Sequence, residues 1–371
     1  MLLLTLKMFS ETGGIEKVNR VLSKTLHEYV LTRDKQPLQV LSLCDQPGDL
    51  DTRYCKKENF RGYGKNKVLF TLSALYKAFS AQTILLSHIN LVSIAASIIF
   101  FGKRKRIIML AHGIEVWRPL KPWKKSFLKK YVEIWAVSRY TAAVLAEKHG
   151  ISTDKIVVLN NCLDPYFTIP DKFARPSYLA SRHQIESDQP VLLTVSRLSS
   201  YEMYKGYDVV IECVKSLITD FPNIRYLLAG KADLNERNRL TNLIEANGLM
   251  ENVILLDYIP DHELADYFLL ADLFVMPSKK EGFGIVFIEA AACGCTALAG
   301  NQDGSKDALL DGDLGLLVNP DDKEAIRASI HKFLKSGQTI ERIKALQRSC
   351  LEHFGYELYK NRVSYLLDSS V

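Results

Sequence analysis

The sequence predicts an α/β protein of two domains, each a parallel β-sheet covered by helices. At 371 residues, the chain is longer than one hydrophobic core usually organises. Short apolar runs of strand length alternate with segments of helical periodicity through both halves. A polar stretch containing Pro170 and Pro176 separates these halves. We therefore place a first domain at residues 1–165, a linker at 166–189, a second domain at 190–352 and a C-terminal helix at 353–371.

The first half begins with an apolar strand at residues 2–6, a Gly-Gly loop, and a helix at 15–30 with apolar residues at helical spacing. Residues 45–67 are polar and basic, and we expect them to be irregular. Further apolar runs predict strands at 39–43, 84–86, 107–111, 134–137 and 156–159. Helices are expected at 67–78, 91–101 and 139–148, the last of them capped by Ser138.

The second half opens with a buried strand at residues 191–195 and continues as repeated strand–helix units. Further strands are expected at 226–229, 253–256 and 273–275. Helices are expected at 209–220, 235–247, 262–270, 285–293, 323–335, 340–352 and 356–367. Residues 84–101 of the first half form the one long apolar stretch, and a membrane span is the alternative interpretation there. Polar residues within that stretch favour a strand, a turn and a helix instead.

Composition limits the class of protein. Apolar residues make up 47% and charged residues 24% of the chain, which favours a globular core over disorder. The seven cysteines are odd in number and scattered, as is typical of a reducing, cytoplasmic compartment. Residues 1–6 are apolar but too short for a signal peptide. Cys293 and Cys295 lack the further ligands of a zinc site, so we expect no metal and no cofactor.

Charge is distributed unevenly between the halves. Residues 1–170 carry 26 Lys or Arg against 13 Asp or Glu, a net charge of +13, whereas the remainder carries −7. Within the basic half, residues 118–131 combine apolar and basic side chains at helical spacing: Trp123, Phe127, Leu128 and Tyr131 with Lys124, Lys125, Lys129 and Lys130. Such a helix can lie on an anionic membrane surface, as a peripheral protein would at the inner face of the plasma membrane. The alternative is a core helix with a solvated basic face.

The most informative stretch runs from Met276 to Gly300. An apolar strand at residues 273–275 leads into a loop with Glu281 and Gly284, and a helix follows that contains Glu289. Loops at the carboxyl ends of parallel strands, before a helix N-terminus, are where α/β folds bind anionic ligands. The two carboxylates can therefore line one binding site.

This stretch, with the order Glu-Gly-Phe-Gly-x4-Glu-Ala-x-Ala-Cys-Gly, resembles the donor-site signature of glycosyltransferase family 4. Members are retaining enzymes of the GT-B fold, in which two Rossmann-like domains face each other across a cleft. The resemblance implies that Glu281 borders the transferred sugar and that Glu289 holds the ribose hydroxyls. It also assigns Phe283, Gly284 and Ile285 to donor binding, and it implies that the C-terminal helix packs back on the first domain.

Three other places carry the same resemblance. Gly13 and Gly14 follow the first strand and resemble the loop that closes over the donor pyrophosphate. Arg197 and Lys205 follow the strand at 191–195 and, by the resemblance, grip the donor diphosphate. Two cations suit that leaving group because negative charge grows on it as the glycosidic bond breaks. His112 follows the strand at 107–111, and the resemblance places it near the sugar and acceptor.

The chain departs from the family pattern in one loop. The family commonly has two glycines followed by a proline and an acidic residue here, whereas residues 298–307 contain Gly300 and Gly304 but no proline, and Thr296 stands where a proline is usual. The identity of the donor sugar is therefore harder to infer. Asp311-Gly-Asp313 looks like the metal-binding motif of another glycosyltransferase fold, but its position between apolar runs favours a turn.

The sequence therefore predicts a metal-independent, retaining hexosyltransferase of bacterial polysaccharide or lipid-linked glycan type. It would move a hexose from GDP-mannose or a UDP-sugar to a hydroxyl of a glycan or lipid-linked acceptor. A possible anionic membrane surface is the third expected partner, and nucleic acid is not expected. Two alternatives are an enzyme of this fold that epimerises UDP-N-acetylglucosamine without an acceptor, and a non-catalytic partner subunit. Intact Arg197, Lys205, Glu281 and Glu289 argue against the latter.

Overall fold

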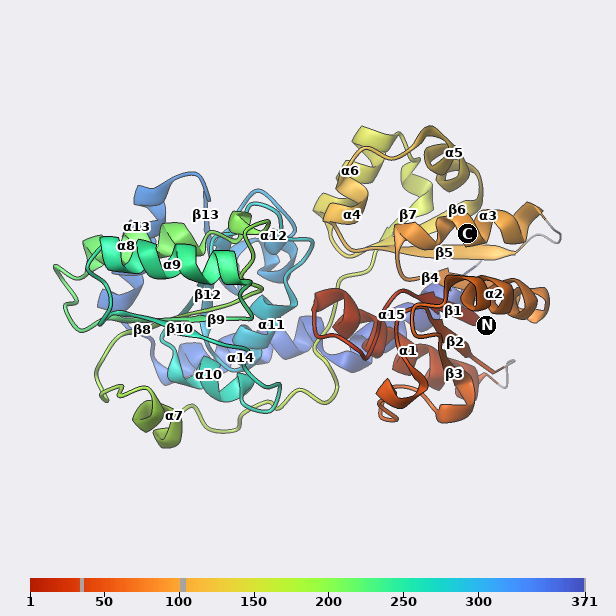
Figure 1. The fold of residues 1–371 in the computed structure, drawn as a ribbon. Helices are drawn as coiled ribbons and strands as arrows, with labels where there is room; N and C mark the ends of the chain where they lie inside the picture. Colours follow the sequence, from red (N-terminus) through yellow and green to blue (C-terminus); the bar gives the residue numbers. More distant parts are fainter. Residues whose placement is uncertain (34–36, 101–104, 370–371) are drawn as a thin grey trace. The chain divides into compact units, whose positions relative to one another are not determined.

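The computed structural model describes residues 1–33, 37–100 and 105–369, and it separates into two compact units (Figure 1). The first unit comprises Met1–Pro165 and Tyr356–Val371, and the second comprises Tyr166–Gly355. Each unit is an α/β domain with one parallel sheet.

The first unit contains a seven-stranded sheet in the order β3-β2-β1-β4-β5-β6-β7, and every neighbouring pair is parallel. Its strands are β1 (Leu2–Thr5), β2 (Gln39–Ser42), β3 (Phe60–Gly62), β4 (Thr83–Leu86), β5 (Arg106–Ala111), β6 (Val132–Ala136) and β7 (Ile156–Val158). Strand β3 lies in the segment expected to be irregular. Its three residues are too few to show an apolar period, and only its pairing with β2 makes it a strand.

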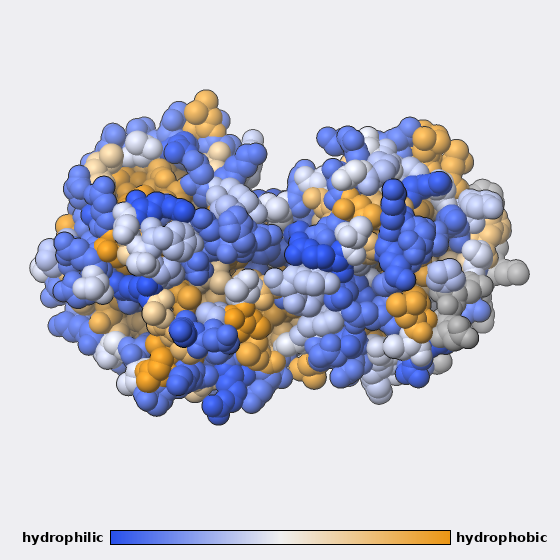
Figure 2. All heavy atoms as spheres, turned by 90° about the horizontal axis from the view of Figure 1, so that it is seen from below, coloured by the Kyte–Doolittle hydropathy of each residue, from blue (hydrophilic) through white to orange (hydrophobic). Residues whose placement is uncertain are grey.

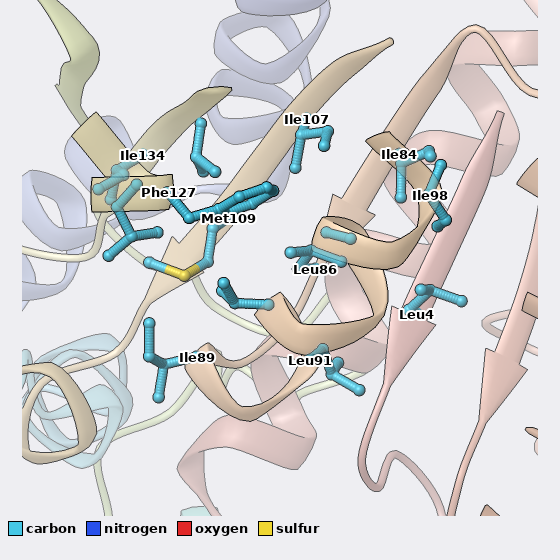
Figure 3. Packing of buried hydrophobic residues seen from close by; sticks show 14 of the residues in the cluster. Leu4, Ile84, Leu86, Ile89, Leu91, Ile98, Ile107, Met109, Phe127 and Ile134 are labelled. Atoms are coloured by element: carbon cyan, nitrogen blue, oxygen red, sulfur yellow. The ribbon is translucent and has the colours of Figure 1, made fainter. Parts of the chain in front are cut away.

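Helices cover both faces of this sheet. They are α1 (Gly14–Thr32), α2 (Lys67–Ser80), α3 (Val92–Phe100), α4 (Ile114–Trp117), α5 (Pro122–Tyr131), α6 (Arg139–His149) and α15 (Tyr356–Asp368). One core cluster lies between the sheet and the layer of α2, α3 and α5. Figure 3 shows Phe127 of α5 within this cluster, beside Met109 of the sheet.

The long apolar stretch divides into β4, a turn and α3, as the sequence predicts. Residue 101, the predicted end of that helix, lies outside the described residues. Within the described part of the chain, no helix has the length and apolar character needed to cross a membrane.

The C-terminal helix belongs to the first unit. Helix α15 begins at Tyr356, which confirms the start of the final helix predicted at residues 356–367. Helix α14 continues to Phe354, so the segment placed at 353–371 also includes the last two residues of α14. The Tyr29 hydroxyl of α1 donates to Asp368 Oδ1 at 2.7 Å. Arg106 donates to the main-chain oxygen of Leu366 at 2.6 Å. These bonds attach α15 to both α1 and β5 of the unit.

The second unit contains a six-stranded parallel sheet in the order β10-β9-β8-β11-β12-β13. Its strands are β8 (Val191–Val195), β9 (Arg225–Ala229), β10 (Val253–Leu256), β11 (Leu273–Met276), β12 (Thr296–Gly300) and β13 (Gly315–Val318). Its helices are α7 (Ser177–Arg182), α8 (Tyr207–Leu217), α9 (Leu234–Ala246), α10 (Leu264–Leu270), α11 (Ile285–Ala292), α12 (Ser305–Ala308), α13 (Lys323–Ser336) and α14 (Ile340–Phe354).

The segment predicted as a linker is more ordered than its composition suggests. It contains α7, and Arg175 just before this helix donates to Asp272 Oδ2 at 2.6 Å. Asp272 Oδ2 also accepts from Val191 N at 2.8 Å, at the start of β8. The segment is thus attached to the sheet of the second unit through one carboxylate, an interaction between residues far apart in sequence.

Candidate active site

In the second unit, the chain changes direction across the sheet between β8 and β11. From β8, the order runs through β9 and β10 on one side and through β11, β12 and β13 on the other. Ligands of open parallel sheets bind at the carboxyl ends of the strands flanking such a switch point. The loop after β8 carries Arg197 and Lys205, and the loop after β11 carries Glu281. The predicted donor residues thus follow the two strands that flank the switch point.

Lys205 and Glu281 form an ion pair across these loops. The distance between Lys205 Nζ and Glu281 Oε2 is 2.5 Å, and the side chains are 15% and 17% exposed. Burial alone lowers the pKa of Lys205, but the neighbouring Glu281 carboxylate reverses this and raises it above its ordinary value. The lysine is therefore a fixed positive charge at the switch point.

Arg197 lies in a different environment from Lys205. Its side chain is 73% exposed, and its Nη2 lies 2.5 Å from Oε1 of Glu202, which is only 16% exposed. Tyr204 is close to both cations: burial raises its pKa, and the charges of Lys205 and Arg197 act in the opposite direction. The structure thus brings the two predicted cations to one loop, although only Lys205 contacts Glu281.

Two glycines shape the loop that carries Glu281. Gly284 has a φ of +88°, and a Cβ atom there would lie 2.4 Å from the Phe287 ring. A Cβ atom on Gly304 would lie 2.0 Å from the main-chain oxygen of Gly282. Only glycine permits either arrangement, because other residues would be strained at the first position and would clash with backbone at the second. The loops after β11 and β12 therefore pack backbone against backbone.

Asp303 connects the same two loops, and the sequence analysis did not identify it. Its Oδ2 accepts from Glu281 N at 2.6 Å, and its Oδ1 accepts from Ser305 N at 2.9 Å. The residue is 1% exposed, and burial raises its pKa from 3.8 to about 6. An aspartate before a glycine in a loop after a strand was the available signal, but the distance to Glu281 depends on the fold.

The other residues predicted to bind the donor are more enclosed. Glu289 on α11 is 2% exposed. Phe283 is also 2% exposed, and its ring packs edge-on against Phe354 at 5.6 Å between centroids. Ile285 is the first residue of α11. The side chain of Phe283 thus anchors the loop from inside, which leaves the main chain of this segment as the part available to a ligand.

In the first unit, the order of strands reverses between β1 and β4, and polar residues gather at the carboxyl ends of β4 and β5. His112 follows β5 and is 8% exposed. Its main-chain N–H donates to Glu115 Oε1 at 2.6 Å, and its Nε2 lies 2.8 Å from the oxygen of Ser87. A carbonyl oxygen only accepts, so Nε2 carries the proton and a neutral His112 presents Nδ1 as an acceptor.

His88 and Glu115 complete this group, and the sequence analysis identified neither. His88 Nδ1 accepts from Asn90 N at 3.0 Å. Burial lowers the pKa of His88 to about 4; the Glu115 carboxylate acts weakly in the opposite direction, whereas His112 and Lys124 lower this pKa further. His88 is therefore neutral at physiological pH.

The Gly-Gly loop of the first unit follows β1. Gly13 has extended backbone immediately before α1, and a Cβ atom on Gly14 would contact nothing within 4 Å. The preceding turn is held by Asp45, which is fully buried and accepts from Met8 N at 2.8 Å and from Ser10 N at 2.9 Å. The space beside Gly14 is therefore open within the protein.

No group of three or more potential metal ligands occurs among the described residues. Asp311 lies in a single 3-10 turn, Leu310–Gly312, with a φ of +57°, and Asp313 follows this turn. The turn predicted for this motif is thus confirmed. The cysteines at 44, 55, 162, 213, 293, 295 and 350 are all free thiols.

Comparison with known proteins gives a partial family match and the same kind of fold. Residues 179–349 match the family described as glycosyl transferases group 1. A similar curated protein is a GDP-mannose-dependent alpha-(1-6)-phosphatidylinositol monomannoside mannosyltransferase of Mycolicibacterium smegmatis, 30% identical over 241 residues. A D-inositol 3-phosphate glycosyltransferase of Streptosporangium roseum is 28% identical over 221 residues. The matches cover 62% and 52% of this chain, and 61% and 50% of those relatives.

Solved structures match over the whole chain. HepE of Anabaena in complex with UDP has a TM-score of 0.81 at 18% identity, with both chains fully covered. Sucrose-phosphate synthase of Thermosynechococcus elongatus has a TM-score of 0.77 at 17% identity, with 99% of this chain and 98% of that one covered. Two parallel α/β sheets with these neighbours establish the GT-B fold.

Proposed function

We propose that this GT-B protein, with its group 1 glycosyl transferase region, is a metal-independent, retaining hexosyltransferase of family 4. The donor is a nucleoside diphosphate hexose bound by the second unit. The acceptor is a hydroxyl of a glycan or lipid-linked glycan in cell-surface polysaccharide or glycolipid synthesis. The observation that carries this proposal is the enclosed Lys205–Glu281 pair at the switch point of the second sheet.

The pair suits an anionic substrate. A diphosphate entering beside Lys205 competes with Glu281 for the ammonium group, and a charge-assisted hydrogen bond to phosphate replaces the ion pair. Glu281 is then released toward the hexose, where it positions a sugar hydroxyl. Lys205 stabilises the charge that develops on the departing diphosphate, and this kind of stabilisation is worth ~10²–10³ in rate.

A retaining reaction on one face of the sugar needs no carboxylate nucleophile. Asp303 is a buried acidic group beside the loop, and both of its oxygens already accept main-chain N–H groups. The leaving phosphate therefore accepts the proton of the acceptor hydroxyl. His112, with Nε2 bonded to Ser87, offers Nδ1 to a sugar or acceptor hydroxyl.

Donor identity is tested by binding. Two relatives motivate the choice: one is named as GDP-mannose-dependent, and HepE was solved with UDP-glucose. Purified protein is heated with GDP-mannose, UDP-glucose, UDP-galactose or UDP-N-acetylglucosamine. A ligand at 100 times its Kd adds about 2.7 kcal/mol to stability, or roughly 5–11 °C for a domain of this size. We expect one nucleotide sugar to raise the melting temperature and Lys205→Ala to remove that rise.

Transfer is tested separately, because an epimerase of this fold would also bind a nucleotide sugar. Donor turnover is measured with and without a glycan or glycolipid acceptor, and the anomeric configuration of the product is read by NMR. Acceptor-dependent release of nucleoside diphosphate with retained configuration supports the proposal. Epimerised donor without any acceptor, or no binding of any nucleotide sugar, contradicts it.

The seven free thiols agree with a cytoplasmic site of action, where nucleotide sugars are made available to such enzymes. Fractionation of cells that express the protein tests this location.

A further inference from the structure

Helix α2 of the first unit exposes most of its large apolar side chains. Toward the core it presents mainly Phe70, Ala74 and Ala78, which are at most 1% exposed. Five larger apolar residues lie outward with exposures of 55–73%: Val68, Leu69, Leu72, Tyr76 and Phe79. On the face that Figure 2 draws, hydrophilic residues dominate and apolar residues form separate patches.

These five residues form one continuous stripe. At 100° per residue, positions 68, 69, 72, 76 and 79 fall within about 100° of the helix circumference. The helix has 14 residues and is therefore about 21 Å long. Single exposed apolar residues are ordinary, whereas a contiguous apolar stripe of this kind marks an interaction surface.

All charged residues of α2 and of the segments on either side of it along the chain are positive. Residues 59–114 contain eight Lys or Arg and no Asp or Glu. Lys65 and Lys67 lie at the N-terminal end of α2, and Lys77 lies within it. At the other end, Lys105 Nζ donates to the main-chain oxygens of Phe79 at 3.0 Å and Ala81 at 2.6 Å. The apolar stripe is thus bounded by lysines at both of its ends.

Helix α5, which the sequence predicts as a membrane-docking helix, exposes fewer large apolar residues than α2. Phe127 and Leu128 pack in the core at 8% and 0% exposure, and the rest of the helix is mainly lysine. Trp123 and Tyr131, which are 45% and 40% exposed, are the large apolar residues left outside. This arrangement matches the alternative interpretation of a core helix with a solvated basic face.

We propose that α2 docks the first unit on an anionic lipid bilayer, with its apolar stripe inserted at the level of the headgroups and its lysines on the lipid phosphates. The large apolar residues of such a helix can enter the hydrocarbon boundary of a bilayer, while its lysines contact the anionic headgroups. This docking deepens the proposed function, because it would hold the enzyme at the membrane that carries a lipid-linked acceptor. Binding is reversible and weakens with salt, since screening acts over about 8 Å at physiological ionic strength.

The test is co-sedimentation of the full chain with vesicles of phosphatidylcholine alone or mixed with phosphatidylglycerol, at low and high salt. The test variant is Leu72→Ser/Tyr76→Ser, at positions 59% and 73% exposed, where the fold should be retained. The control is Leu234→Ser/Met250→Ser in the second unit, at positions 74% and 56% exposed. We expect the wild type and the control to sediment with the anionic vesicles at low salt. The partition coefficient of the α2 variant should fall about tenfold.

Charge variants separate the two helices. Lys67→Glu/Lys77→Glu should abolish sedimentation, whereas Lys129→Glu/Lys130→Glu on α5 should weaken it only slightly. The proposal is overturned if the wild type remains in the supernatant, if the α2 variants sediment like the wild type, or if only the α5 variant loses binding. A second measurement is sedimentation velocity without vesicles. The proposal is also overturned if the wild type is a dimer, the α2 variant is a monomer, and addition of vesicles does not dissociate the wild-type dimer.

Docking and catalysis can fail independently. The donor-dependent rise in melting temperature should be the same in the wild type and in the α2 variants, since α2 and the Lys205 site belong to different units. Loss of that rise in every protein would contradict the proposed function and leave the vesicle result standing.

Discussion

The polar groups at the two switch points are held in opposite ways. In the first unit, the side chains bond mainly to main chain: His112 to the oxygen of Ser87, and Asp45 to the N–H groups of Met8 and Ser10. In the second unit, Lys205 and Glu281 bond to each other. A bond to main chain holds the side chain against a backbone atom that the fold keeps in place, whereas an ion pair between two side chains can exchange one partner for a ligand.

This difference indicates a division of roles. The first unit offers atoms in fixed positions, which suits the orientation of an uncharged hydroxyl. The second unit offers a charge that a diphosphate can take over, which suits a charged donor. Asp303 lies in the second unit but bonds to main chain, because its carboxylate accepts from Glu281 N. The following predictions test this contrast.

The largest effect is expected at Lys205. Lys205→Ala should lower kcat/KM by ~10²–10³, because it removes the charge aimed at the diphosphate. Lys323 provides a matched control, since it forms an ion pair with Glu212 at 2.7 Å but is 45% exposed. Steady-state kinetics of Lys323→Ala should be near those of the wild type. Equal losses of kcat/KM in Lys205→Ala and Lys323→Ala would contradict a specific role of Lys205 at the diphosphate.

His112 is expected to have the next largest effect. His112→Asn should lower kcat by about 10², as misplacement of a reacting group does, with little change in melting temperature. His149 is the control, because its Nε2 also lies 2.7 Å from a main-chain oxygen, that of Val116. His149→Asn should lower the melting temperature and leave kcat of the folded enzyme unchanged. The reverse pattern would assign His112 a purely structural role.

Asp303 should produce a pH dependence. Its folded pKa of about 6 lies above the ordinary 3.8, so the folded state takes up this proton first as pH falls. Protonation of this group therefore adds stability between about pH 6 and 4, while it weakens the acceptor for Glu281 N. We expect kcat/KM to fall below about pH 6 without unfolding.

The check is a pH–rate profile with circular dichroism at each pH. Asp303→Asn should be about tenfold less active at pH 7.5, because one main-chain N–H loses its acceptor. Its profile should also lack the acid limb. An acid limb of the same apparent pKa in this variant would assign it to another group.

Arg197 should matter less than Lys205. It is 73% exposed and pairs with Glu202, and exposed ion pairs contribute at most ~1 kcal/mol, or about fivefold. Arg197→Ala should therefore reduce kcat/KM only severalfold, and a double-mutant cycle with Glu202→Gln should show weak coupling. A loss as large as that of Lys205→Ala would mean that Arg197 moves onto the diphosphate when the donor binds.

The smallest effect is expected from metal removal. Because Lys205 can supply the positive charge that a metal ion would place on the diphosphate, turnover in EDTA should equal that in buffer. Loss of activity that Mn²⁺ or Mg²⁺ restores would contradict metal independence and direct attention back to Asp311 and Asp313.

Most elements of the fold could be predicted, because strands of a parallel sheet are apolar on both faces and helices between them show a clear period. Strands β3, β12 and β13 and helix α7 were not predicted. Each is only three to six residues long and is held by contacts with residues distant in the sequence. Within the site, Glu281 and Lys205 stood out through their surrounding motifs. Asp303 did not, because its position 22 residues after Glu281 carries no local signal of their contact.

The α/β class, the strand–loop–helix order around Glu281 and Glu289, and the excess of positive charge in the first half follow from the sequence alone. These features depend on residue type and spacing along the chain. The contact between Lys205 and Glu281 depends on the folding of distant segments, as does the exposure of Arg197, whose side chain is 73% exposed. The tertiary structure also decides that Phe127 is buried while Leu72 and Tyr76 of α2 face outward. The reason is physical: an apolar period predicts which residues share a helix face, but only packing against neighbouring elements decides which face is buried.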